Sequence, residues 1–225
     1  MNDHTIPYLI SEQDYENWAI AWKELESEGK PFHFFKSEEG VLTSVVFDAD
    51  YISSLISTTG IATVKIRFGY DRDAESFKII IYGTDLSGQI LTPYYVPART
   101  VYTGKVLMEG HGKVPKELMN QWLENWVEAV EKDNITYKNF MTPYGFTRGF
   151  NYPLEEFLQP LFKFEKAPEI FVCFVMHKYF GINYLSTKET TSTFGVVIQG
   201  RGLATENDSK SDPFYDLTAP CPRTC

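Results

Sequence analysis

The chain has 225 residues, with 21 lysines and arginines against 30 aspartates and glutamates, and a formal net charge of −9. This length can bury the core of one large domain or of two small ones. A hydrophobic fraction of 43% and a charged fraction of 23% exclude a collagen-like, low-complexity or wholly disordered chain. Because the balance is acidic and lacks clustered Lys and Arg, we expect no nucleic-acid partner.

The first expected element is an amphipathic helix over residues 12–27. Gly29, followed by Pro31, predicts where this helix ends. The apolar residues of one face recur at helical spacing: Trp18, Ala21, Trp22 and Leu25.

A β-hairpin is expected next, with strands over residues 32–35 and 41–47 and a polar loop between them. Residues 47–56 have the acidic start and the apolar repeat of a second helix. Two strands follow, over residues 64–68 and 77–82, and the first alternates apolar and basic side chains, which predicts one exposed face. This first module is therefore helix, hairpin, helix, strand, strand.

The same series of landmarks recurs in the second half of the sequence. The four tryptophans form two pairs with one spacing, Trp18 with Trp22 and Trp122 with Trp126, and a four-residue step places both rings of a pair on one helix face. Three further landmarks keep their order: residues 47–56 match 152–161, residues 76–83 match 193–200, and Pro93-Tyr94-Tyr95 matches Pro213-Phe214-Tyr215. We favour tandem duplication over a chance likeness of two α+β halves.

We therefore predict an α+β fold made by tandem duplication of a helix–hairpin–helix–strand–strand module, with a mainly antiparallel sheet and helices packed on one face. The predicted parts are a first module over residues 1–105, a second over 106–219, and a flexible tail over 220–225 that contains two cysteines. Residues 98–114, with three glycines, are the expected connector, and residues 181–191 are an expected loop insertion in the second module.

No targeting or membrane segment is expected. The stretch from Met1 to Pro7 lacks the basic start and the apolar run of a signal peptide. The longest apolar run, Ile170 to Met176, is too short to cross a bilayer, and it predicts a strand that is covered on both faces. We therefore expect a cytoplasmic protein without a membrane partner.

No complete motif for catalysis or for a cofactor is present. The segment Gly110-His111-Gly112-Lys113 resembles a phosphate loop, but Leu107 and Val114 stand where a Walker motif needs Gly and Ser or Thr. The acidic residues within 71–75 lack the central glycine and the final glutamate of a calcium loop. We therefore predict no cofactor and favour a protein that is not an enzyme.

The three cysteines are too few for a disulfide-stapled fold of this size. Cys173 lies inside the apolar run and is predicted to be a buried small hydrophobe. Cys221 and Cys225 are weak candidates for a metal site, because two ligands would need His or Cys from another copy or from a partner to complete four. We favour a disordered tail without chemistry, and a disulfide and covalent attachment are the other interpretations.

Phe, Tyr and Trp make up 16% of the residues and supply most of the candidate binding residues. His111 is included because a histidine between glycines near the expected connector would be exposed. The candidates are Tyr94, Tyr95, His111, Arg148, Phe214 and Tyr215. The alternative is ordinary core packing in two similar modules. In that case only residues that differ between the modules bear on function.

The tail Pro220 to Cys225, the turn Gly83 to Gly88 and the Phe-rich helix–strand–strand unit resemble a group of short bacterial proteins that end in Pro-Cys-Pro-x-x-Cys. This resemblance implies a bacterial source and an ancestral single-copy unit, and it implies no catalytic residue. Our hypothesis is a non-enzymatic protein-binding or assembly module that presents an aromatic, acidic surface to a protein partner or to another copy of itself. The alternative is an enzyme of unrecognised type with a pocket at the seam between the modules.

Overall fold

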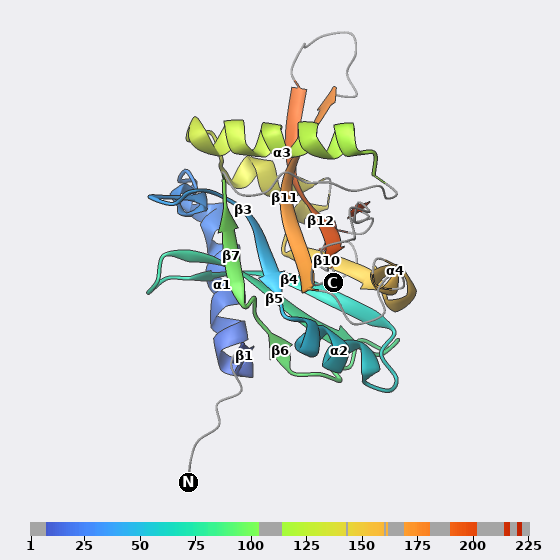
Figure 1. The fold of residues 1–225 in the computed structure, drawn as a ribbon. Helices are drawn as coiled ribbons and strands as arrows, with labels where there is room; N and C mark the ends of the chain where they lie inside the picture. The colour runs from blue at the N-terminus through green and yellow to red at the C-terminus, as the bar shows by residue number, and fades with distance from the viewer. Residues whose placement is uncertain are drawn as a thin grey trace.

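The structure is a computed structural model that describes residues 8–103, 114–142, 144–159, 161, 169–180, 190–201, 214–216 and 220–221. The chain has a mixed α+β fold in which every described strand pair is antiparallel. Figure 1 shows the strands of two sheets at the centre and the helices around them.

The first half of the chain, residues 8–103, contains two α-helices and seven short or long strands. Their bounds are β1 (Leu9–Ile10), α1 (Glu12–Glu28), the 3-10 helix η1 (His33–Phe35), β2 (Lys36–Ser37), β3 (Gly40–Phe47), α2 (Ala49–Ser57), β4 (Thr63–Asp71), β5 (Ser76–Thr84), β6 (Tyr94–Tyr95) and β7 (Arg99–Tyr102).

The second half, residues 114–221, repeats the order of long helix, 3-10 helix, strands, short helix and two long strands. Its elements are α3 (Lys116–Glu131), η2 (Tyr137–Phe140), β8 (Met141–Thr142), β9 (Gly145–Phe146), β10 (Gly149–Pro153), α4 (Leu154–Leu158), β11 (Glu169–Phe180), β12 (Thr190–Arg201), β13 (Phe214–Asp216) and β14 (Pro220–Cys221).

The signals that predicted the first helix have clear physical counterparts. The side chain of Ser11 accepts a hydrogen bond from the backbone N–H of Asp14, which caps the start of α1. Gly29 ends the helix in the left-handed conformation, with φ of 63°. The predicted helix over residues 12–27 is therefore confirmed, with one further residue at its end.

Each of the two main sheets combines strands from both halves. The first sheet has the order β1-β6-β5-β4-β10-β14, so two strands of the second half extend the strands of the first half. The second sheet has the order β13-β12-β11-β3-β2, and β7 also pairs with β3. A small third sheet pairs β8 with β9. The halves therefore share both main sheets.

The two main sheets have matching orders and registers. If each strand of β6-β5-β4-β10-β14 is replaced by its counterpart in the other half of the chain, the order becomes β13-β12-β11-β3-β7. This is the order in the second sheet, where β7 pairs with β3. Ile81 lies opposite Tyr95 in the first sheet, and Ile198 lies opposite Tyr215 in the second. Ile81 and Ile198 occupy the same place in the matched segments 76–83 and 193–200, and Tyr95 and Tyr215 occupy the same place in the matched Pro-Tyr-Tyr and Pro-Phe-Tyr segments.

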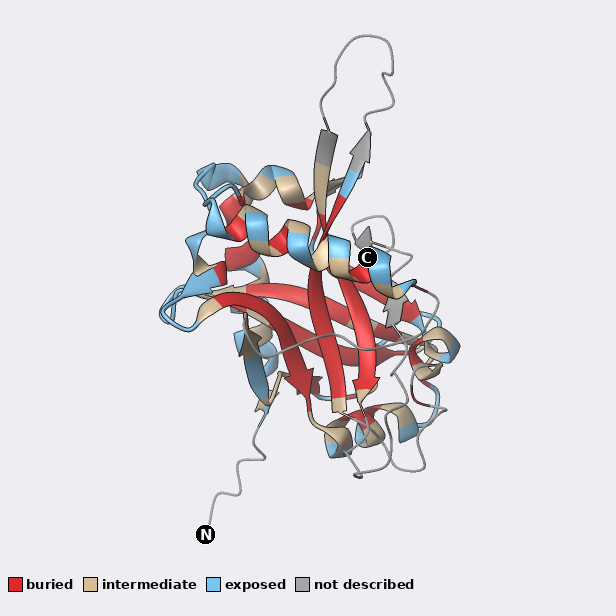
Figure 2. Cartoon of the chain, turned by 45° about the horizontal axis from the view of Figure 1, so that its top comes forward, coloured by how far each residue is buried: buried red, intermediate tan, exposed pale blue. Residues whose placement is uncertain are grey.

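The main hydrophobic core lies between the inner faces of the two sheets and is rich in aromatic rings. Its members include Trp22, Phe68 and Phe77 from the first half. They also include Trp126, Phe174 and Phe194 from the second half. Figure 2 shows the long strands as the most continuously buried part of the chain.

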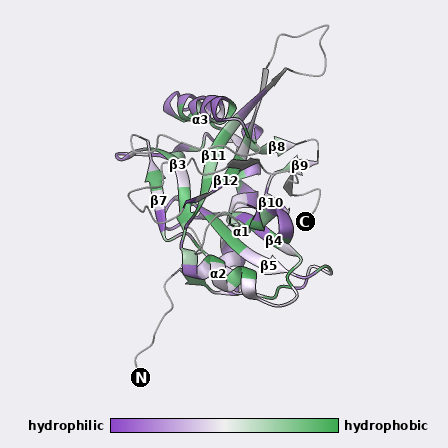
Figure 3. Cartoon of the chain, turned by 45° about the vertical axis from the view of Figure 1, so that its right-hand side comes forward, coloured by the Kyte–Doolittle hydropathy of each residue, from purple (hydrophilic) through white to green (hydrophobic). Residues whose placement is uncertain are grey.

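A long helix covers part of the outer face of each sheet. Tyr15 and Trp18 of α1 pack on the cluster of Ile80, Tyr82 and Tyr94 from the first sheet. On the second sheet, Met119 of α3 belongs to a buried cluster with residues of β3, β11 and β12, and Trp122 packs against it. Hydrophilic residues on α3 and hydrophobic stretches on the strands are visible in Figure 3. No helix in the described part of the chain has the length and apolarity needed to span a bilayer.

Two predicted elements differ from the structure in their type or length. Residues 33–35 form the 3-10 helix η1 rather than a strand, because Phe32 and Phe35 are buried three positions apart, which suits a 3-10 turn and breaks strand alternation. The predicted helix over 152–161 is helical only at Leu154–Leu158, since Tyr152 and Pro153 belong to β10.

The predicted connector and tail also contain strands. Arg99–Tyr102 pairs with β3 as β7, and Pro220–Cys221 pairs with β10 as β14. Both pairings give hydrogen-bond partners to backbone N–H and C=O groups at a sheet edge. Amino-acid composition does not predict such pairings. The rest of the connector and most of the expected insertion, residues 104–113 and 181–189, lie outside the described residues.

Candidate binding pocket

The two tyrosines of β6 are buried on opposite faces of the first sheet. Tyr94 is 8% exposed and stacks on Tyr15, with ring centroids 4.5 Å apart. Tyr95 is 5% exposed, faces the core between the sheets and contacts Tyr51. Successive strand residues point to opposite faces, so these side chains fill two different clusters and do not form one exposed surface.

The other predicted binding residues are dispersed. Arg148 is exposed between β9 and β10, and its carbonyl oxygen accepts a hydrogen bond from the backbone N–H of Phe68. Phe214 and Tyr215 belong to the edge strand β13, whose backbone pairs with β12. In the second sheet, β12 and β11 lie between β13 and β3. His111 lies outside the described residues.

The two tail cysteines are described only in part. The backbone of Cys221 lies opposite Gly149 in the first sheet, and Cys225 lies outside the described residues. Cys173 is fully buried, as predicted. Within the described ranges, no three side chains among His, Cys, Asp and Glu are grouped as a metal site would require.

An open pocket of about 790 Å³ lies at the edge of the second sheet. It is lined by Glu39, Arg99, Thr100, Val101, Tyr102, Thr103, Phe171 and Arg201. Six of these eight residues belong to the first half of the chain and two to the second. The pocket is therefore built by both halves, through the pairing of β7 with β3 and of β3 with β11.

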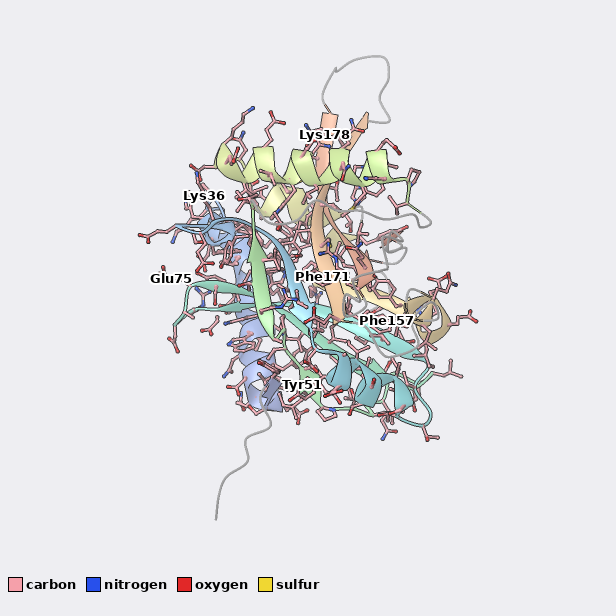
Figure 4. The ribbon with its side chains drawn as sticks, viewed as in Figure 1. Lys36, Tyr51, Glu75, Phe157, Phe171 and Lys178 are labelled. Carbon is pink, nitrogen blue, oxygen red and sulfur yellow. The ribbon has the colours of Figure 1, made fainter. Side chains whose placement is uncertain are left out.

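The register of the second sheet explains why two arginines meet at one aromatic ring. Phe171 lies opposite Gln199 on one side and opposite Val46 on the other, and Val46 in turn lies opposite Arg99. Arg201 is two residues beyond Gln199 on β12 and therefore points to the same face. Figure 4 labels Phe171 in the region where β3 and β11 run side by side.

The guanidinium groups of both arginines contact the ring of Phe171. The Cζ atom of Arg201 lies 4.2 Å from the ring centroid, and that of Arg99 lies 5.3 Å from it. These are cation–π distances, and they hold planar guanidinium groups at the pocket wall. We call this group the Arg99–Phe171–Arg201 cluster.

Further hydrogen bonds hold the two arginines in place. Arg99 donates to the carboxylate of Glu169 at 2.7 Å, and the Nε atom of Arg201 donates to the side-chain oxygen of Gln199 at 3.0 Å. Gln199 is fully buried, so it is a fixed acceptor for Arg201. Arg99 is thus oriented at the exposed side of the pocket, whereas Arg201 is only partly exposed.

The opposite end of the pocket carries a negative charge. Glu39 is exposed in the turn between β2 and β3. This turn lies beside Thr103, because the Thr103 hydroxyl accepts a hydrogen bond from the backbone N–H of Val41 at 2.9 Å. From Arg99 to Thr103 the chain advances by about 13 Å, at about 3.3 Å per residue in a strand. The pocket therefore has the two arginines at one end and the carboxylate of Glu39 at the other.

The same region of the first sheet has a different set of side chains. By matched register, Lys65 occupies the position of Phe171, and Thr84 the position of Arg201. Arg67, on the same strand as Lys65, is 7% exposed and donates to Asn151 at 2.8 Å and to the carbonyl oxygen of Phe150 at 3.0 Å. Burial, and then the charge of Arg67, lower the pKa of Lys65. The Arg99–Phe171–Arg201 cluster is therefore particular to the second sheet.

The sequence alone does not single out Arg99, Phe171 or Arg201. Arg99 lies in the predicted connector, and Phe171 lies in the apolar run. A signal was nevertheless present, because Phe171 and Arg201 have unlike residues at the matched positions in the first half. Compared with protein-family models, with curated proteins and with solved structures, the chain matches none of them.

Proposed function

We propose that this chain is a non-enzymatic protein-binding module and that the Arg99–Phe171–Arg201 cluster is its main contact site. The observation that carries the proposal is an open pocket in which two oriented arginines converge on one aromatic ring. Arginine and aromatic side chains are the types enriched where proteins bind one another. The contact surface we propose is thus aromatic and basic at its centre, on a chain that is acidic overall.

We further propose that the chain arose by tandem duplication, with modules over residues 1–105 and 106–219. The matched element order, the matched sheet order and the matched registers support this origin. The modules would differ from the separate units expected from the sequence, because each one supplies strands to the sheet of the other. The repeated residues then form the scaffold, and the unlike residues around the pocket carry the function.

The alternative function, an enzyme with a pocket between the modules, shares the position of this pocket. Its described lining contains Glu39, Tyr102 and the two arginines as titratable groups, and it contains no histidine or cysteine. Among the described hydrogen bonds, none joins the carboxylate of Glu39 to a threonine or tyrosine hydroxyl of the lining, so these residues are not arranged as the paired nucleophile and base that covalent catalysis requires. The pocket supports binding better than catalysis.

Affinity capture with a pocket variant tests the proposed function. The wild-type chain, the Arg99→Gln/Arg201→Gln double variant and an Arg148→Gln control would be immobilised and exposed to a lysate of the source organism. Arg148 is an exposed arginine outside the pocket, so its variant has the same type of change at another place. We expect proteins that the wild type and the control retain and the double variant loses. Equal capture by all three, or a lone monomer with no partner in native mass spectrometry, contradicts the proposal.

A further inference from the structure

We infer that Lys65 and Arg67, on the outer face of β4, form a binding site for phosphate, either free or as the terminal group of a small phosphate ester. The site lies on the first sheet, whereas the Arg99–Phe171–Arg201 cluster lies on the second, so this inference does not depend on the proposed function. Three observations support it: the two cations converge, neither has an acidic partner among the described residues, and hydrogen-bond donors of Arg67 remain available.

The head group of Arg67 reaches the row of residues that contains Lys65. In this row, Lys65 lies between Tyr82 of β5 and Asn151 of β10. The guanidinium group of Arg67 donates to the side-chain oxygen of Asn151 at 2.8 Å, and its Cζ atom lies 5.9 Å from the centroid of the Tyr82 ring. Arg67 therefore contacts the neighbours of Lys65 on both sides. Because Lys65 and Arg67 are two positions apart on one strand, their side chains leave the same face about 6.6 Å apart.

Neither cation is balanced by a carboxylate within the described ranges. Arg67 is 7% exposed, and there it donates only to neutral acceptors, the side chain of Asn151 and two backbone carbonyl oxygens at 3.0 Å. Burial, and then the charge of Arg67, lower the pKa of Lys65, and no carboxylate of the described residues acts against them. A buried positive charge is ordinarily paired. Two adjacent cations without a counter-charge, on a chain of net charge −9, therefore indicate a place for an anion.

The scaffold does not require cations at these two positions. By matched register, Phe171 of the second sheet corresponds to Lys65. Cys173 likewise corresponds to Arg67. Phe171 and Cys173 belong to the buried apolar cluster that also contains Met119 of α3. The same place in the fold is thus apolar and packed beneath a helix in one sheet, and basic in the other. This difference between matched sites points to a use of the two charges beyond packing.

The charges and the remaining donors favour a phosphate over a carboxylate. A phosphate monoester carries about −1.5 to −2 charges near neutral pH and balances both cations, whereas a carboxylate leaves one of them unbalanced. In the described structure, Arg67 uses both N–H groups of Nη1 and one of Nη2, which leaves its Nε–H and the second N–H of Nη2 for a ligand. Charge-assisted hydrogen bonds are about 2.7–2.9 Å long, so one phosphate between the two side chains can accept from both. Because Arg67 is almost buried, the group that reaches it must be small, as a terminal phosphate is.

Nuclear magnetic resonance titration of the full chain, with isotope-labelled lysine and arginine, tests the inference. The probes are inorganic phosphate, glycerol phosphate and acetate, each compared with sodium chloride at the same ionic strength. We expect both phosphates to shift the Nε–H signal of Arg67 and to raise the pKa of Lys65, because a bound anion favours the charged form of the amine. Lys65→Gln should weaken phosphate binding about tenfold, as measured at the Arg67 signal. Tighter binding of glycerol phosphate than of inorganic phosphate would support a phosphate ester, and the reverse order would support the free ion.

Lys78→Gln is the matched control for Lys65→Gln. Lys78 extends from the same face of the first sheet, and it is already paired with Asp71 at 3.4 Å. This variant should bind both phosphates as the wild type does. Urea unfolding without phosphate checks the fold of Lys65→Gln, which should be no less stable than the wild type because a like charge beside Arg67 is removed.

Four results would each overturn the inference. They are no shift of the Arg67 signal at about 20 mM phosphate, an unchanged pKa of Lys65, equal affinity for acetate, and equal phosphate affinity of Lys65→Gln and the wild type. The Arg99→Gln/Arg201→Gln variant should bind phosphate as the wild type does, since its changes lie on the other sheet. Loss of phosphate binding in that variant would place the anion at the pocket of the second sheet, and the inference would then be wrong.

Discussion

The ring of Phe35 stacks on the ring of Phe140, with centroids 6.0 Å apart and an angle of 11° between their planes. Each of these residues ends the 3-10 helix that follows the long helix of its half. Trp126 lies 4.9 Å from Phe35, and Trp22 lies 5.0 Å from Phe140, both nearly edge-on. Under the proposed duplication, Phe35 and Phe140 meet because they lie beside the axis that relates the halves. The centre of the core is then one aromatic set used twice.

A chain cut between residues 107 and 108 should reassemble. Each fragment then lacks the partner strands that the other half supplies, β10 for β4 and β3 for β11. We therefore expect the co-expressed fragments to purify as a 1:1 complex with the circular dichroism spectrum of the intact chain. Light scattering on each fragment alone provides the control. A folded monomer of either fragment would contradict an arrangement in which both halves complete each sheet.

Replacing either core tryptophan with phenylalanine should destabilise the fold by a similar amount. The indole N–H of Trp22 donates to the carbonyl oxygen of Thr147 at 2.9 Å, and that of Trp126 donates to Leu42 at 2.8 Å. Loss of either donor leaves a buried carbonyl oxygen without this hydrogen bond, which costs about 1–3 kcal/mol. Urea unfolding of Trp22→Phe and Trp126→Phe measures the change in the free energy of unfolding.

Trp18→Phe is the matched control for these variants. Trp18 is half-buried on the outer face of the first sheet, where it packs near Lys78. We expect a smaller loss of stability there than at Trp22. If Trp18→Phe is as damaging as Trp22→Phe, the hydrogen bonds between the halves do not have the role assigned to them.

Much of the local structure could be predicted because its causes are local. The cap of α1, its terminal glycine and the spacing of its tryptophans are all visible in sequence. The prediction that residues 170–176 are covered on both faces is confirmed, since alternate residues belong to two different hydrophobic clusters. The matched strands of residues 76–83 and 193–200 likewise occupy corresponding places in the two sheets.

The pocket could not be predicted because it depends on pairing between distant strands. Arg99 reaches Phe171 only through the intervening β3, and both contacts join residues far apart in sequence. When no short turn joins a strand to its partner, the sequence does not indicate which sheet edge the strand will join. Of the aromatic residues proposed from the sequence, Tyr94 and Tyr95 are buried in two hydrophobic clusters. Two of the three residues of the proposed contact site, Phe171 and Arg201, differ from the residues at their matched positions in the first half.

Gly149→Ala should be among the most damaging small substitutions in the chain. Gly149 has φ of 142°, and a Cβ atom there would overlap the carbonyl oxygen of Ile66 on the paired strand β4. A backbone atom cannot move aside cheaply, so steric overlap and the unfavourable φ should together cost about 3 kcal/mol or more. Gly88→Ala is the control, because Gly88 has φ of 89° and open space around it. We expect about 1–2 kcal/mol there, and equal losses at both glycines in urea unfolding would contradict the close approach of β10 and β4.

Cys173 should make the fold less stable at alkaline pH. Burial raises the pKa of its thiol from 9.0 to about 12, and Arg201 lowers it by a smaller amount. Between these values the unfolded chain loses the thiol proton while the folded chain keeps it. The contribution of the Cys173 thiol to the free energy of unfolding is therefore fully present below pH 9. It declines as the pH rises toward 12, by up to about 1.4 kcal/mol per pH unit.

The measurement compares urea unfolding at pH 8, 9 and 10 for Cys221→Ser/Cys225→Ser with and without Cys173→Ala. The two tail cysteines are replaced in both proteins so that they contribute equally. Cys173→Ala should lower stability at pH 8, because it leaves a small cavity in the buried cluster beneath α3. It should also flatten the decline above pH 9, since the residue that ionises only on unfolding is gone. Parallel curves for the two proteins would show that Cys173 is accessible enough to ionise in the folded state.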